Sequence, residues 1–245
     1  MTDSVTFGSQ FLTFIHQVHE VIDETIYPSK KYVDEPERFY YTILHKLATV
    51  GDVIAFLITN LDGKPHYANG TIILARTSML DTICLYYVLD QTNDEENQKK
   101  RIDNILNDHV RSIYQSAANE EKKLEIRNQY PWCFESGKFR ADIERITTKK
   151  MIDSLHVEEL KKPTDRALKL YSLFSKVEHN GLFTFNILHS HYNDSDKRSV
   201  MMNYDAALVI SEVIMIVLLH WIDKDDGRYR KLLHLYGLMG KCFNN

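Results

Sequence analysis

Five polar side chains within two apolar helical segments are the first candidates for chemistry in this chain. Arg76 and Asp81 stand among apolar neighbours in one segment. In the other, intervals of four residues place three side chains along one helix flank, namely Tyr171, Ser175 and His179. A carboxylate can orient a histidine, and an arginine can bind an anion or the same carboxylate. If the two segments meet, these residues predict an acid–base or anion-binding site.

The same five residues also fit a purely structural role. Arg76 and Asp81 are five positions apart, which is not the three- or four-residue spacing of an ion pair within one helix. Each of the two should therefore find its partner on another helix. Hydrogen-bond networks that fix how helices pack are common in protein cores, and buried polar groups need partners. We favour this structural interpretation over a catalytic one.

A second candidate pair, Arg101 and His109, lies in a highly charged segment. Eight positions separate the two residues, so on a helix they share one face. The arginine could then bind a phosphate while the histidine acts as general acid or base. Because the charged segment has only a thin apolar stripe, we favour the interpretation that both side chains lie on a solvent-exposed helix face.

Metal and cofactor signatures are absent from the sequence. His16 and His19 share a helix face, and His189 and His191 lie close together, but a metal site needs three or four ligands in a closed geometry. The three cysteines are scattered, and no HExxH motif occurs. Phosphate-binding glycine loops and the GxSxG element are also missing. We therefore expect neither a metal ion nor a cofactor.

The elements that must position these residues are long helices. The chain of 245 residues contains only 9 Gly and 5 Pro, which is too few for a protein made of many strands and tight turns. Apolar residues recur at intervals of three and four, as in helices. We expect an all-α protein: a single bundle of about seven to nine helices over residues 1–245. Residues 91–162 should form a charged, partly protruding section of that bundle.

The helical periodicity also predicts where the helices lie. Pro163 should end one helix, and Thr164 or Asp165 should cap the next. The most apolar segments, 68–89 and 199–222, should form the centre. The predicted helices are 9–26, one that starts near residue 36, 68–89, 94–118, 120–129, 141–160, 166–192, 199–222 and 228–243.

Two helices of this chain resemble those of a family of uncharacterised bacterial helical domains. That family carries an Arg-x4-acid helix followed by a Tyr-x3-Ser-x3-His helix. The matching residues are Arg76, Asp81, Tyr171, Ser175 and His179, and Trp132 and Arg101 fit more loosely. The resemblance covers roughly residues 70–185. It implies a helical fold and carries no assigned chemistry.

The chain is also distantly similar to the HEPN superfamily of helical ribonucleases and binding proteins from bacterial toxin and phage-defence systems. The hallmark of that superfamily is an arginine, four to six residues, and then a histidine. Arg101 and His109 come nearest to it, with a spacer one residue too long. The resemblance implies a metal-independent ribonuclease that uses His109 or His179 together with Arg101 or Arg76.

Charge and hydropathy favour a soluble, cytoplasmic protein without membrane contact. The net charge is −4, and no third of the chain has the basic excess of a nucleic-acid-binding surface, so nucleic acid is expected only if the protein is a ribonuclease. The N-terminus lacks the features of a signal peptide. The most apolar stretch, 206–222, contains Glu212 and is slightly short for a membrane span of roughly 20 residues, so we interpret it as a core helix.

The absence of a catalytic motif favours a binding or regulatory module without catalytic chemistry, whose partner is an unidentified protein or small molecule. The adjacent aromatics Tyr40–Tyr41 and Tyr86–Tyr87 should bring at least one ring of each pair to the surface, which favours a homodimer.

Two enzymatic alternatives stay open at this stage. One is the HEPN-like ribonuclease, and the other is a metal-dependent enzyme that uses Asp81 and His179. The sequence does not decide whether the protein is an enzyme.

Overall fold

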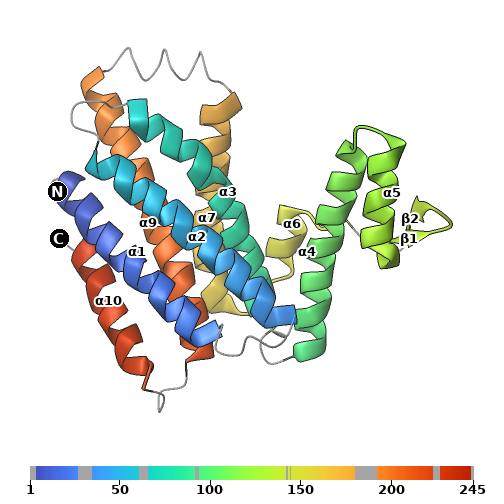
Figure 1. Ribbon diagram of the computed structural model, residues 1–245. Helices are drawn as coiled ribbons and strands as arrows, with labels where there is room; N and C mark the ends of the chain where they lie inside the picture. Colours follow the sequence, from blue (N-terminus) through green and yellow to red (C-terminus); the bar gives the residue numbers. More distant parts are fainter. Residues whose placement is uncertain are drawn as a thin grey trace.

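The protein is all-α, as predicted, with nine α-helices in the part of the chain that the structure describes. The structure is a computed structural model and describes residues 4–26, 35–60, 66–91, 94–141, 143, 145–179, 192–222 and 227–243. The α-helices are α1 (Ser4–Ile26), α2 (Glu35–Thr59), α3 (His66–Leu89), α4 (Glu95–Ser116), α5 (Glu120–Gln129), α6 (Thr148–Asp153), α7 (Glu158–His179), α9 (Tyr192–Trp221) and α10 (Tyr229–Phe243). Figure 1 shows a bundle from which α4 and α5 lead away to one side.

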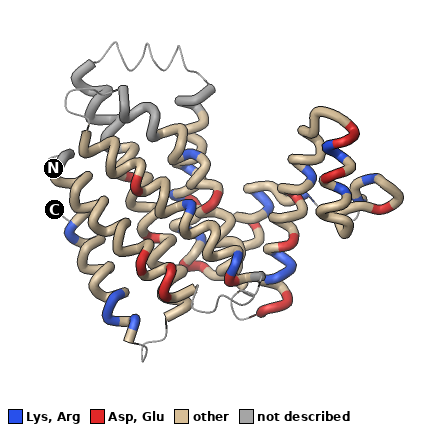
Figure 2. The backbone as a smooth tube through the Cα atoms, viewed as in Figure 1, with Lys and Arg blue, Asp and Glu red and all other residues tan. Residues whose placement is uncertain are grey.

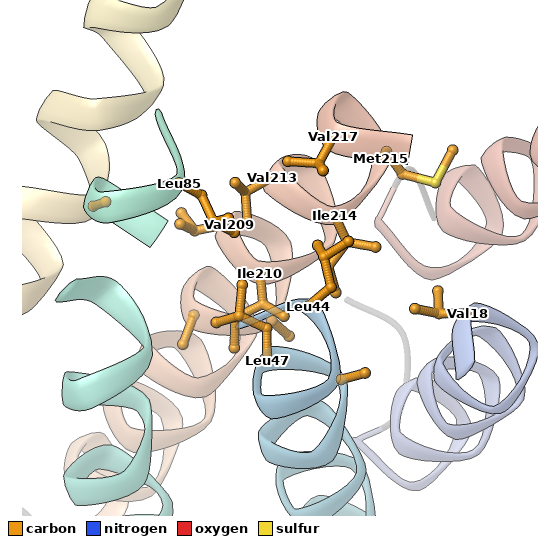
Figure 3. Packing of buried hydrophobic residues seen from close by; sticks show 14 of the residues in the cluster. Val18, Leu44, Leu47, Leu85, Val209, Ile210, Val213, Ile214, Met215 and Val217 are labelled. Atoms are coloured by element: carbon orange, nitrogen blue, oxygen red, sulfur yellow. The ribbon is translucent and has the colours of Figure 1, made fainter. Parts of the chain in front are cut away.

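Helices α3 and α9 form the centre of the bundle, as the sequence predicts. Helix α9 packs against α1, α2, α3, α7 and α10, and α3 packs against α2, α4, α6, α7 and α9. Buried residues of α9 such as Ile210 and Ile214 lie next to Leu44 and Leu47 of α2 (Figure 3). Because these two helices are apolar on nearly every side, they gain most by being surrounded.

Helices α1 and α2 run antiparallel and approach each other closely because two glycines lie between them. A Cβ atom on Gly51 of α2 would stand 2.7 Å from Cδ1 of Ile15. A Cβ atom on Gly8 of α1 would stand 2.9 Å from the backbone nitrogen of Thr59. Both distances are shorter than van der Waals contact, so larger residues would push the two helices apart.

The start of α7 differs from the prediction. The helix begins at Glu158 and includes Pro163, which we expected to end a helix. The carboxylate of Asp90 accepts hydrogen bonds from the backbone N–H groups of His156 and Val157, each at 2.7 Å. This contact from the end of α3 holds the start of α7, a tertiary effect that overrides the local signal of the proline. The helix predicted over 141–160 is reduced to the short α6.

The predicted charged section contains an arm that projects from the bundle (Figure 1). We define the arm as residues 95–141: α4, α5, the 3-10 turn Pro131–Cys133 and a hairpin of two short strands, β1 (Phe134–Glu135) and β2 (Lys138–Phe139). Acidic and basic residues alternate along it (Figure 2). The hairpin was not predicted from the sequence; its turn residues Ser136 and Gly137 both have positive φ, 50° and 77°.

Within the part of the chain that the structure describes, three helical segments are long and apolar enough to cross a membrane, judged by length and composition alone. They are Pro36–Thr59, Ile72–Leu89 and Met202–Trp221. In this fold the three segments belong to helices that pack against one another. The soluble, cytoplasmic character expected from the sequence therefore stays a prediction.

Candidate functional site

Arg76 and Tyr171 meet between α3 and α7, as the sequence predicts. The Arg76 guanidinium lies over the Tyr171 ring, 5.2 Å from the ring centre, and Nη2 donates a hydrogen bond of 3.4 Å to the tyrosine hydroxyl. A cation over an aromatic face is attracted by the ring's negative face. Both side chains are half-buried, so this contact helps to fix how α3 packs on α7.

Asp81 pairs with a residue that was not predicted from the sequence. Lys46 of α2 places its Nζ 2.7 Å from Oδ2 and 3.0 Å from Oδ1 of the Asp81 carboxylate. Burial raises the pKa of Asp81 above its ordinary value, and the hydrogen bond and charge of Lys46 act in the opposite direction. The neighbouring Cys84 thiol is also buried, which raises its pKa to about 12 and makes it a poor nucleophile. Asp81 therefore links α3 to α2.

Among the described side chains of the predicted set, Ser175 adds no reactive group to this pair of contacts. The Ser175 hydroxyl donates a hydrogen bond of 2.8 Å to the Tyr171 carbonyl one turn earlier in the same helix. Such a bond is common for serines within helices and satisfies the hydroxyl proton within the helix itself. The side chain of His179 lies outside the described residues. The sequence therefore predicted one contact of the set correctly, between Arg76 and Tyr171.

Arg101 is buried, so the predicted solvent-exposed position of this residue is wrong. Its guanidinium donates hydrogen bonds to Asp90, at 3.0 Å, to the Tyr87 carbonyl, and to the Ser154 carbonyl, at 3.0 Å. It also stacks on the Tyr87 ring at 4.3 Å. The first turns of α4 pack against α3, which covers this side of the charged helix. Tyr86 and Tyr87 are both buried, so the surface ring expected from that pair is also absent.

Asp90 is the acidic partner of Arg101 and was not predicted from the sequence. Burial alone would raise its pKa. The hydrogen bonds from Val157, Gln91 and His156 and the charge of Arg101 together lower the pKa of Asp90 below its ordinary value. One signal was present in the sequence, since Asp90 directly follows the apolar run that ends α3. Its partners lie up to 67 residues away along the chain and could not be predicted from spacing.

The predicted pair of Arg101 and His109 does not form a phosphate-binding and acid–base site. His109 is exposed, as expected, whereas the Arg101 guanidinium is directed into the junction of α3, α4 and the residues after α6. An arginine whose N–H groups are bonded to Asp90 and two carbonyls has few donors left for a phosphate. The two residues therefore share a helix but face different surroundings.

No metal centre forms among the residues that the structure describes, where no three His, Cys, Asp or Glu side chains are placed to hold an ion. Comparisons with known proteins add no relative: no protein-family model, curated protein or solved structure matches this chain. Function must therefore be inferred from the geometry of the chain itself.

Proposed function

We propose that this protein is a non-catalytic binding module that contacts a partner protein through its arm. Three of the polar candidates support this proposal, because their contacts are structural. Asp81 joins α3 to α2, Arg76 stacks on Tyr171, and Arg101 is held by Asp90. A polar group bound in this way stabilises helix packing and is not free to exchange protons with a substrate.

The observation that carries the proposal is the exposed apolar surface of the arm. Three large side chains there are about half exposed to solvent: Leu106 (49%), Leu124 (52%) and Trp132 (58%). Tryptophan is enriched among the residues that dominate binding energy at protein interfaces. Because the arm projects away from the bundle, these side chains are accessible to a second protein (Figure 1).

Helix α5 supports the same conclusion, because it has no buried residue. A helix of ten residues is marginal in water without tertiary packing. Here it is stabilised locally, by the Asn119 side chain, which accepts a hydrogen bond from the Lys122 N–H, and by the ion pair of Lys123 with Glu120 at 2.9 Å. A helix that covers no core contributes little to the bundle, so its use is better sought in contacts with another molecule.

The arm is also held in a defined shape, as an interaction element requires. The Phe134 ring packs between Tyr114 and Phe139, with ring centres 4.8 and 5.3 Å away. Arg111 stacks on Phe139 at 4.8 Å and donates a hydrogen bond to the Ile143 carbonyl. A preformed surface loses less conformational entropy on binding than a flexible one. Trp132 is therefore presented from an ordered support.

The proposal can be tested by comparing two exposed aromatic positions. Trp132 in the arm and Tyr236 on α10 are exposed to a similar degree, 58% and 66%. The tagged wild-type chain should copurify with a partner protein from its native cells. The Tyr236→Asp variant should still copurify with that protein, and the Trp132→Asp variant should not. That protein, once purified, should bind the wild type and fail to bind Trp132→Asp. Equal binding by both variants would contradict a role for the arm.

A further inference from the structure

A chain of polar contacts crosses the surface between α1 and α2. Nδ1 of His19 lies 3.2 Å from Nδ1 of His45. On the outer side of each ring, Nε2 of His19 lies 2.9 Å from Asp52, and Nε2 of His45 lies 3.0 Å from Asp23. His16 adds a further contact with Asp52 at 3.7 Å. Two imidazoles therefore face each other, and each has a carboxylate behind it.

The fold positions this pair firmly. Gly51 allows α1 and α2 to approach closely, and Asp52 follows it in the next position. The rings of His19 and His45 stack with their centres 5.3 Å apart. Tyr41 holds the far end, because its hydroxyl donates a hydrogen bond of 3.1 Å to Asp23. Both histidine side chains are about three-quarters covered, with exposed fractions of 25% and 24%.

The contacts indicate how many protons the pair holds in this geometry. Each Nε2 faces a carboxylate, which only accepts hydrogen bonds, so each Nε2 carries a proton. Between the two Nδ1 atoms, two lone pairs or two N–H groups would repel each other, so one atom carries a proton and the other accepts it. Four ring nitrogens therefore hold three protons. The pair carries one positive charge between two negative carboxylates.

Two lysines on the surrounding helices have carboxylate partners of their own. Lys46 of α2 pairs with Asp81 of α3, and Lys231 of α10 pairs with Glu24 at the end of α1. Helix α9 presents apolar side chains such as Met215 to this pair of helices (Figure 3). Among the residues that the structure describes, His19 contacts Asp52, and His45 contacts Asp23 and the Tyr41 ring, whereas His16 reaches the pair only through Asp52.

We propose that His19 and His45 form a proton-binding site that couples the packing of α1 on α2 to pH. The folded pair keeps three ring protons, whereas an unfolded pair gains or loses protons freely. Unfolded histidines are half protonated at about pH 6.5, where the two rings together hold an average of three protons. They hold more below that pH and fewer above it.

The sign of the coupling follows from these proton numbers. Stability rises with pH where the unfolded state binds more protons, and it falls where the unfolded state binds fewer. The contribution of the pair should therefore be greatest near pH 6.5 and decline on both sides. For a folded pair with three protons, the folding equilibrium constant falls about eightfold between pH 6.5 and either pH 5 or pH 8. A single histidine beside one carboxylate would change stability in one direction only.

The experiment compares the folding equilibrium constants of the wild type and His19→Gln/His45→Gln at pH 5, 6.5 and 8, with EDTA present. The folding equilibrium constant of the wild type divided by that of the double variant should be greatest near pH 6.5. This ratio should be about eightfold smaller at pH 5 and at pH 8. His234→Gln, which removes an exposed histidine on α10, should give a ratio that does not peak. A ratio that is flat or changes in one direction would overturn the proposal.

A second measurement does not depend on whether the variant folds. Nitrogen NMR of the wild type at pH 6.5 should show both Nε2 atoms of His19 and His45 protonated and one proton shared by their Nδ1 atoms. Two neutral rings with one proton each would overturn the proposal. The proposal would also be overturned if one equivalent of Zn²⁺ bound to both rings and the pH dependence of stability appeared only without EDTA.

Discussion

Replacing Arg101 with methionine tests whether the candidate residues are structural. Methionine keeps an unbranched apolar chain in the buried site but removes the guanidinium. The substitution removes the ion pair with Asp90 and the hydrogen bonds to the carbonyls of Tyr87 and Ser154. Breaking a buried ion pair by removing one partner costs about 3–5 kcal/mol.

The structure places this cost at the lower end of the range. Asp90 keeps its hydrogen bonds from the backbone of His156 and Val157, so the carboxylate that remains is still solvated by the protein. We therefore expect a loss of about 3 kcal/mol in the free energy of unfolding. For a chain of this length each kcal/mol lowers Tm by about 2–4 °C, so the expected shift is about 6–12 °C.

The assay is thermal unfolding followed by circular dichroism at pH 7, with Lys100→Met as the control. Lys100 lies on the same helix and is exposed, so its replacement should change stability by no more than about 0.5 kcal/mol. If Arg101→Met melted at the same temperature as Lys100→Met, the structural role assigned to Arg101 would be refuted.

Three further experiments test the packing of the glycine positions, the contribution of Asp90 and the ribonuclease alternative. Gly8→Ala places a Cβ against the backbone of Thr59 and should cost about 1–3 kcal/mol, whereas Gly237→Ala, with open space around it, should stabilise α10 by about 0.5–1 kcal/mol in the same denaturation assay. Because the pKa of Asp90 is lowered in the folded protein, the carboxylate contributes fully to stability above its unfolded-state pKa near 3.8. This contribution is lost as the pH falls through the folded-state pKa. The Tm difference between wild type and Asp90→Asn should therefore be constant above about pH 5 and shrink below about pH 4. Single-stranded RNA incubated in EDTA should stay equally intact with wild type and His109→Ala, and cleavage by the wild type alone would favour the ribonuclease alternative.

The helical fold could be predicted because it depends on local patterns. The scarcity of glycine and proline and the spacing of apolar residues indicate helices directly, and the segments around Met79 and Ile210 are buried at the centre as expected. Pro163 shows where local reasoning fails. Its signal to end a helix is overridden by Asp90, which lies far away along the chain.

The polar contacts were harder to predict because each one joins distant parts of the sequence. Arg76 and Tyr171 could be matched, since both stand on apolar helices that need partners. Lys46 was missed because nothing in its own surroundings distinguishes it from a surface lysine. The contact between His19 and His45 depends on how closely α1 and α2 approach, and that distance is a property of the folded helix pair.

The most direct test of the proposed binding role is photo-crosslinking in the cells that produce the protein. A photoreactive phenylalanine analogue replaces Trp132 in the arm and, in a separate variant, Tyr236 on α10. Because both positions are exposed aromatics, neither replacement should disturb the fold. We expect a discrete crosslinked complex from position 132 and none from position 236. No complex from position 132, or the same products from both positions, would contradict a binding role for the arm.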